Sequence, residues 1–177
     1  MRRSAQRYSG GRARAPRAVQ DLPAVVYLRG GPSITGASSS MTVVQQDTAF
    51  VPAILTVAPG ATVEFTNADP FFHNVFSYSE AMRFDLGRYP AGQSKTVTFD
   101  ESGIVKVYCE VHDFMRAVIL VLDTPYHSTV SEDGSFTIRG VPPGTYDLVA
   151  WHTDLDEQVT SVTVAAGETA TVEVTLQ

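Results

Sequence analysis

The stretch from residue 104 to residue 122 reads IVKVYCEVHDFMRAVILVL and decides the fold. It contains two runs that are typical of β-strands, 104–109 and 117–122, with a short loop between them. In the first run every second residue is apolar, which places Cys109 on the apolar face of its strand. The stretch therefore predicts two neighbouring strands joined by a tight loop that begins at a cysteine.

Similar strand-like runs recur on both sides of this stretch, and turn residues such as Gly and Pro divide them. No segment of useful length shows the helical period, so the sequence predicts an all-β protein built as a β-sandwich. The runs before the opening stretch are 24–28, 41–45, 54–57, 62–66 and 95–99, and those after it are 135–138, 146–151, 159–164 and 169–176.

The runs after Pro125 form a series of their own. About 50 residues is little for an independent core, so we expect this second module to pack closely on the first. The predicted organisation is a disordered basic leader over 1–22, a first domain over 23–123 and a small β-module over 124–177.

Charge is distributed unevenly along the chain, whose net charge is −6. Residues 1–19 contain six arginines and no acid, which leaves 7 basic and 19 acidic residues, a net charge of −12, in the rest of the chain. A body this acidic disfavours nucleic acid and anionic membranes and favours a basic partner protein. The longest apolar run, 117–122, is too short to span a membrane.

The opening stretch contains a Cys-x-x-His-x-x-Met motif formed by Cys109, His112 and Met115. A tight loop can direct a thiolate, an imidazole nitrogen and a thioether toward one point. A second imidazole is available at His73, in the segment that follows the run 62–66. Two histidines, one cysteine and a weak axial methionine are the ligands of blue-copper electron-transfer sites, so this set predicts one copper ion.

Two other interpretations of the motif are open. Cys109 and Met115 could simply fill the core, which is what buried cysteine and methionine usually do. Zinc is the next candidate metal, although zinc rarely accepts a thioether ligand. Given Cys109, the chance of finding His and Met at these two spacings is roughly one in two thousand for this composition, which favours copper.

Three segments carry a resemblance to a known family. The segments APGATVEFTN (58–67) and FFHNVF (71–76), followed by the cysteine loop, resemble the plastocyanin/amicyanin-type cupredoxins, and the short loop is most similar to that of amicyanin. The resemblance covers about residues 41–122 and implies a Greek-key sandwich with copper at one end. It assigns the ligands to His73, Cys109, His112 and Met115.

The resemblance also implies a role for Asn74, next to the first histidine. Its side chain would hold the two ligand loops together by hydrogen bonds near the thiolate, a supporting role that tunes the metal. The alternative is that Asn74 is an ordinary loop residue.

The second module resembles a different family. The segment DGSFTIRGVPPGTYDLVAWH (133–152) is similar to carboxypeptidase-regulatory, transthyretin-like β-modules, which normally have no active site. Chains with these two parts resemble the methylamine-utilisation or plastocyanin-like proteins of bacteria. We expect Trp151 to lie in the core and His152 at a surface or interface, and we expect no ligand role for His127.

An electron carrier is the function that these features favour. The exposed edge of His112 would be the electron port, and Phe71, Phe72 and Phe114 would form an apolar docking patch. The expected partner is a redox protein such as a c-type cytochrome or a dehydrogenase, and we expect no nucleic-acid partner and no membrane span.

The alternative function is a non-redox module that sequesters or delivers copper. An enzyme would need an open coordination position, which four protein ligands leave no room for, so we expect none. We expect a periplasmic or other extracytoplasmic location, although Arg2 and Arg3 are followed by no apolar segment of an export signal.

Overall fold

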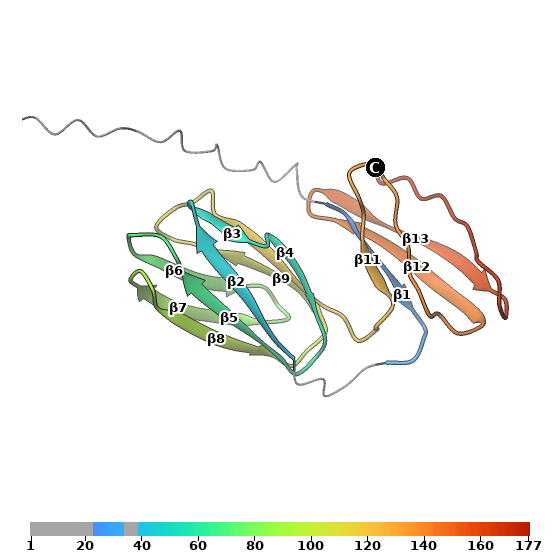
Figure 1. The fold of residues 1–177 in the computed structure, drawn as a ribbon, viewed down its shortest axis with the longest axis horizontal. Helices are drawn as coiled ribbons and strands as arrows, with labels where there is room; N and C mark the ends of the chain where they lie inside the picture. Colours follow the sequence, from blue (N-terminus) through green and yellow to red (C-terminus); the bar gives the residue numbers. More distant parts are fainter. Residues whose placement is uncertain (1–22, 34–38) are drawn as a thin grey trace, which may run out of the picture.

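The computed structural model describes residues 23–33 and 39–177, and these residues form thirteen β-strands. The predicted basic leader over 1–22 lies outside the described residues. No described segment forms a helix that could cross a membrane. The all-β prediction is confirmed, and the strands are arranged in three sheets (Figure 1).

Two of the sheets form the sandwich that contains the cysteine loop. The five-stranded sheet has the order β4 (Ile54–Val57), β10 (Arg116–Val121), β9 (Gly103–Tyr108), β6 (His73–Tyr78) and β7 (Arg83–Tyr89). The four-stranded sheet has the order β3 (Ala49–Val51), β2 (Ser40–Gln46), β5 (Ala61–Asn67) and β8 (Ser94–Phe99).

The core between these two sheets follows from the alternation of the strands. In β5 the side chains of Ala61, Val63 and Phe65 are fully buried, and the intervening residues are partly exposed. They pack with Val107 of β9 and Ile119 of β10 in one apolar cluster. The same cluster includes Cys109 and Met115, so it supports the end of the sandwich where the cysteine loop lies.

The third sheet belongs to the C-terminal module and corrects one predicted boundary. Its order is β11 (His127–Thr129), β1 (Val25–Arg29), β12 (Gly144–His152) and β13 (Leu155–Val164). The first domain was expected to begin at residue 23, but β1 pairs with β11 and β12 and lies inside the second module. The side chains of Val26 and Leu28 are buried in that module's own core, which explains the placement.

Two predicted strands of this module are not strands. Segments 135–138 and 169–176 have no regular secondary structure and lie outside every sheet of the described residues. Their apolar residues nevertheless pack on the third sheet, among them Phe136, Ile138 and Val172. The alternating pattern was therefore a correct sign of one-sided burial, but it did not determine backbone pairing.

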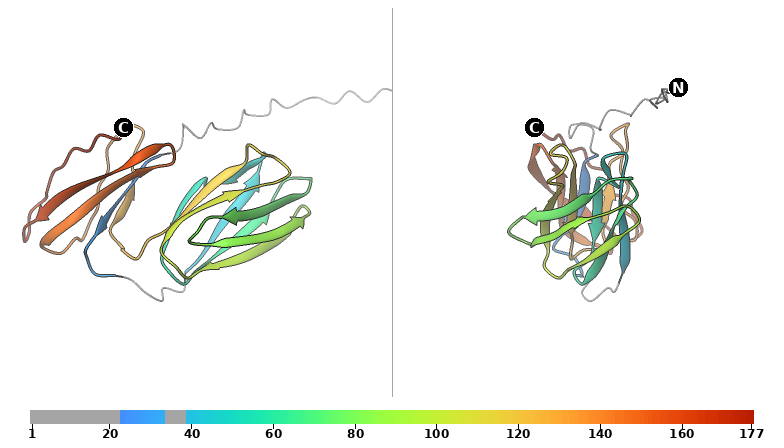
Figure 2. Two further views of the ribbon diagram at one scale, coloured as in Figure 1. Left: turned by 180° about the vertical axis from the view of Figure 1, so that it is seen from behind. Right: turned by 90° about the vertical axis from the view of Figure 1, so that its left-hand side faces the viewer.

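The two parts of the chain share an apolar interface and lie side by side (Figure 2). Val118, Leu120 and Leu122 project from the outer face of the five-stranded sheet and pack against Val25 and Trp151 of the third sheet. The expected packing of the second module on the first is confirmed. Trp151 is 6% exposed, as expected for a core residue.

Candidate metal centre

The candidate ligands lie at the ends of neighbouring strands. His73 is the first residue of β6, and Cys109 directly follows β9. The loop 109–115 then leads into β10, and its shape is fixed by two backbone hydrogen bonds. The Met115 N–H donates to the His112 carbonyl (3.0 Å), and the Cys109 N–H donates to the Met115 carbonyl (3.3 Å). This closed loop directs several side chains toward β6.

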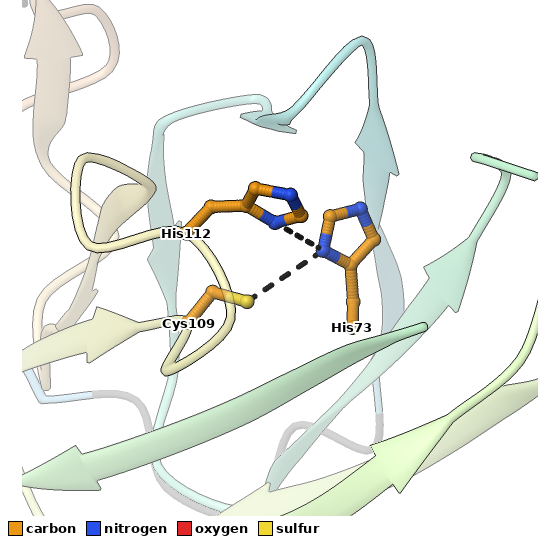
Figure 3. Close-up of side chains that lie close together, drawn as sticks. All are labelled: His73, Cys109 and His112. Atoms are coloured by element: carbon orange, nitrogen blue, oxygen red, sulfur yellow. Dashed lines mark hydrogen bonds between the residues drawn. The ribbon is translucent and has the colours of Figure 1, made fainter. Parts of the chain in front are cut away.

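Three of these side chains converge (Figure 3). The Nδ1 atoms of His73 and His112 are 3.3 Å apart, and the Sγ atom of Cys109 is 3.6 Å from the Nδ1 atom of His73. All three potential ligand atoms lie within 4.8 Å of one another. Two ring nitrogens and a sulfur are thus close enough to contact one ion.

The distances suit a metal ion held in a trigonal arrangement. Bonds of about 2.0–2.1 Å to imidazole nitrogen and about 2.3 Å to thiolate sulfur, at about 120° to each other, separate two nitrogens by about 3.5 Å and a nitrogen and a sulfur by about 3.8 Å. The observed separations, 3.3 Å and 3.6 Å, are close to these values. The donor set of two imidazoles and one thiolate suits copper.

The site is shielded from water on all sides but one. His73, Cys109 and Met115 are at most 2% exposed, whereas His112 is only partly buried. Burial and the neighbouring His73 imidazole lower the pKa of His112. A lowered pKa keeps this ring neutral near pH 7 and leaves a nitrogen lone pair for a metal.

Met115 is buried with Cys109 in the sandwich core, at the end of the ligand loop. A thioether in this position would be the weak axial ligand of the predicted set. Its ligation stays a prediction.

Asp69 orients the His73 ring from the side that faces away from Cys109 and His112. The Nε2–H of His73 donates to an Asp69 carboxylate oxygen at 2.8 Å, so the opposite nitrogen, Nδ1, faces Cys109 and His112. The same carboxylate accepts hydrogen bonds from the backbone N–H groups of Asp47 (2.7 Å) and Thr48 (2.9 Å). Burial opposes ionisation of Asp69, but these three hydrogen bonds outweigh it and lower the pKa of the carboxyl group.

Replacing Asp69 with asparagine should weaken copper binding by roughly ten- to a hundred-fold, the usual cost of losing a group that orients a histidine ligand. The single oxygen of an amide cannot accept all three hydrogen bonds, so the His73 ring loses its fixed orientation. Competition with a chelator measures the affinity. Asp100→Asn changes an exposed carboxylate in the same way and is the control. Equal copper affinity in the two variants would contradict the role given to Asp69.

Asn74 connects the two segments that carry the ligands. Its side-chain oxygen accepts a hydrogen bond of 2.7 Å from the backbone N–H of Glu110, the residue after Cys109. The backbone carbonyl of Asn74 accepts a hydrogen bond from the buried side-chain amide of Gln45. The side-chain oxygen of Gln45 in turn accepts a hydrogen bond of 2.6 Å from the Tyr89 hydroxyl. Burial raises the pKa of Tyr89, so this hydroxyl stays a neutral donor.

The three phenylalanines expected to form a docking patch lie at the exposed edge of the site. Phe71, Phe72 and Phe114 are 40%, 56% and 45% exposed. The ring centroids of Phe71 and Phe114 lie 5.3 Å and 5.9 Å from that of His112. The partly exposed histidine is therefore flanked by apolar rings. His127 and His152 lie on β11 and β12 of the third sheet, away from this group.

Sequence reasoning missed Asp69, Gln45 and Tyr89. A signal for Asp69 was present, because a carboxylate four residues before a candidate histidine ligand can reach the ring nitrogen that faces away from the metal. Gln45 and Tyr89 lie on strands far from the motif in sequence, and they reach Asn74 only through the pairing of the sandwich.

Two family comparisons match parts of the chain that overlap at residues 114–122. Residues 37–122 match the copper binding proteins of the plastocyanin/azurin family, and residues 114–177 match the carboxypeptidase regulatory-like domain. Among curated proteins none matches the chain.

Solved structures with a similar fold include three copper proteins. A purple cupredoxin from Nitrosopumilus maritimus is 22% identical over 46% of this chain and 98% of its own (TM-score 0.42). A copper(I) form of an amicyanin variant is 20% identical over 54% and 97% (TM-score 0.45). The copper-containing nitrite reductase of Thermus scotoductus is 22% identical over 60% of this chain but only 26% of its own (TM-score 0.46). The two family matches indicate a part similar to the plastocyanin/azurin copper-binding proteins, followed by a part similar to the carboxypeptidase regulatory-like domain.

Proposed function

We propose that the protein carries single electrons between redox partner proteins, through one copper ion held by His73, Cys109, His112 and Met115. The observation that carries this proposal is the convergence of two imidazole nitrogens and the chain's one thiol in a preformed site. When bound, copper in such a ligand set supplies a one-electron couple between Cu(I) and Cu(II).

The residues around the site favour fast electron exchange because they hold the ligands still. Asp69 fixes the ring of His73, and Asn74 ties the His73 segment to Glu110. The backbone hydrogen bonds of the 109–115 loop restrict Cys109 and Met115 in the same way. Ligands that do not rearrange keep the reorganisation energy of the change between Cu(I) and Cu(II) low. The buried surroundings also exclude water, which would otherwise reorient around the metal.

An enzyme is a weaker proposal for this site. Catalysis at a metal requires a coordination position that substrate or water can occupy. The buried Met115 and the three converging ligands would surround the ion, and the exposed side is closed by the ring of His112. The arrangement instead supports electron transfer through the exposed edge of the His112 ring.

Docking of one partner would take place over that edge. Phe71, Phe72 and Phe114 provide an apolar surface around His112, suited to a brief contact with a c-type cytochrome or a dehydrogenase. We also propose a periplasmic or other extracytoplasmic location, which rests on the resemblance to plastocyanin and amicyanin.

Adding Cu(II) to the purified protein is the direct test. We expect an intense visible thiolate-to-copper charge-transfer band that saturates at one copper per chain, together with a reversible one-electron couple. The reason is that Cys109 is the chain's one cysteine and lies among the candidate ligands. Weak d–d absorption alone would contradict the blue-copper site. Rapid loss of copper to a chelator, without a reversible couple, would favour sequestration or delivery instead.

A further inference from the structure

The outer face of the five-stranded sheet is divided into two halves. Over β4 and β10, Ile54, Val118 and Leu120 pack in the cluster that joins the two parts of the chain. Ile104, near the start of β9, also packs there, but the rest of the face over β9, β6 and β7 is open, and Tyr78 is 73% exposed. No described part of the chain covers this second half.

Aromatic side chains form a row across the open half. Tyr108 of β9 lies opposite Phe76 of β6 in the strand pairing, and their ring centroids are 5.8 Å apart. Phe76 in turn lies 5.2 Å from Tyr78, ring to ring. The row begins beside the metal site, because Tyr108 is the residue before Cys109.

Cations surround this row. Arg83 lies opposite Tyr78 and Arg116 opposite Tyr108, and Lys106 lies two residues before Tyr108 on the same face. All three cations are exposed, and none of them forms an ion pair with another described residue. We call Tyr78, Arg83, Lys106, Tyr108 and Arg116 the basic face.

Three acidic residues adjoin the basic face without cancelling its charge, and one of them is the exposed Glu80 in the turn between Tyr78 and Arg83. Asp85 lies opposite Phe76 and accepts a hydrogen bond from Gly87, and Glu110 forms an exposed ion pair of 3.4 Å with Arg88. With Arg88 included, four of the seven basic residues that follow residue 19 lie on this half of the sheet. The remainder of the body is correspondingly more acidic.

We propose that the basic face docks a partner protein through an acidic surface. The proposal rests on the function proposed above and names the chemistry of one partner. Opposite charge across an interface accelerates encounter and fixes orientation, and tyrosine and arginine are among the side chains enriched at the residues that contribute most to binding. A partner docked here lies beside Tyr108 and therefore next to the metal site.

This assignment revises the expectation from net charge. The acidic body as a whole predicts a basic partner, but charges in solution are screened beyond about 8 Å at physiological salt. The affinity of docking therefore depends mainly on the cations that lie within the contact surface itself. The apolar patch around His112 and the basic face are separate surfaces, so an electron donor and an acceptor can use different ones.

Binding to a short polyglutamate peptide tests the basic face without relying on copper. The full metal-free chain, labelled with nitrogen-15, is titrated with the peptide at low ionic strength. We expect shifts centred on the amides of Tyr78, Arg83 and Lys106, and affinity that falls as salt rises. The double reversal Arg83→Glu/Lys106→Glu should weaken binding at least tenfold. Arg139→Glu, at an exposed arginine of the second module, is the matched control and should leave the affinity unchanged.

Shifts centred on the third sheet or the ligand loop, or equal affinities for the double reversal and the control, would overturn the proposal. Self-association of the free chain that the double reversal abolishes would also overturn it, because a second copy would then be the occupant. Binding at the basic face in a protein whose copper shows no reversible couple would leave this docking surface supported and refute electron transfer.

Discussion

A chain shortened to begin at Ser39, and so lacking β1, should lose the folded state of the C-terminal module. The strand β1 lies between β11 and β12, and its removal leaves both without their central partner. It also removes Val26 and Leu28, which are 2% and 3% exposed, from the core of that module. Hydrogen exchange of the β12 amides measures the effect, which should be a loss of protection.

The same deletion should destabilise the copper domain without destroying its site. The module covers Val118, Leu120 and Leu122, and burial of each such side chain contributes about 1.5 kcal/mol or more. Their exposure removes several kcal/mol from the free energy of unfolding and favours aggregation. The candidate ligands lie on β6 and the 109–115 loop, so the copper spectrum should remain.

Two further chains make this test specific. A chain beginning at Pro23 keeps β1 and is the control, in which β12 should stay protected. A chain ending at Asp123 should lose stability but keep its copper spectrum, since it has lost the cover of the second module. Protected β12 amides in the chain beginning at Ser39 would show that β1 is dispensable. An altered copper spectrum in the chain ending at Asp123 would place part of the site in the second module.

The convergence of the candidate ligands was accessible to sequence reasoning because most of it is local. Cys109, His112 and Met115 lie within seven residues, and a tight loop between two strands limits where their side chains can point. His73 could be added because its segment follows a strand with a clear alternating pattern. The local spacing, with His73 added, therefore predicted that His73, Cys109 and His112 meet, without any knowledge of the strand order. Ligation by Met115 stays a prediction.

The partner of β1 could not be predicted in this way. The five residues of β1 do not indicate which strands will lie beside them. Pairing between segments more than a hundred residues apart is decided by the packing of whole modules. The expected domain boundary followed sequence order, whereas the chain crosses from the second module to the first and back. The tendency of a segment to form a strand depends on its own residues, whereas the sheet that it joins depends on distant parts of the chain.

The basic face could not be predicted from the sequence for a related reason. Net charge counts every residue equally, but Arg83, Lys106 and Arg116 come from three strands and meet only through the register of the sheet. Asp69 is different: its distance in sequence from His73 is short, and attention to what holds a histidine ring would have found it. Only the long-range part of the site required the structure.

Replacing Cys109 with serine should abolish the visible charge-transfer band of the copper-loaded protein completely. The band requires a copper–sulfur bond from a thiolate, and no other cysteine can supply one. A serine hydroxyl is a hard, neutral donor, so the remaining His73 and His112 nitrogens should bind Cu(II) more weakly and with only d–d absorption. Absorption and electron paramagnetic resonance spectra at equal copper loading measure the change.

The fold of the variant must be checked separately, because residue 109 is 2% exposed and a buried hydroxyl without a partner costs roughly 1–3 kcal/mol. Cys109→Ala removes the thiol without adding a hydroxyl, and His127→Asn changes a histidine of the third sheet outside the candidate site. We expect both cysteine variants to lose the band while remaining folded, and the His127 variant to keep it. A band that survives in Cys109→Ala would mean that the colour does not come from this thiolate, and the proposed copper site would then be wrong.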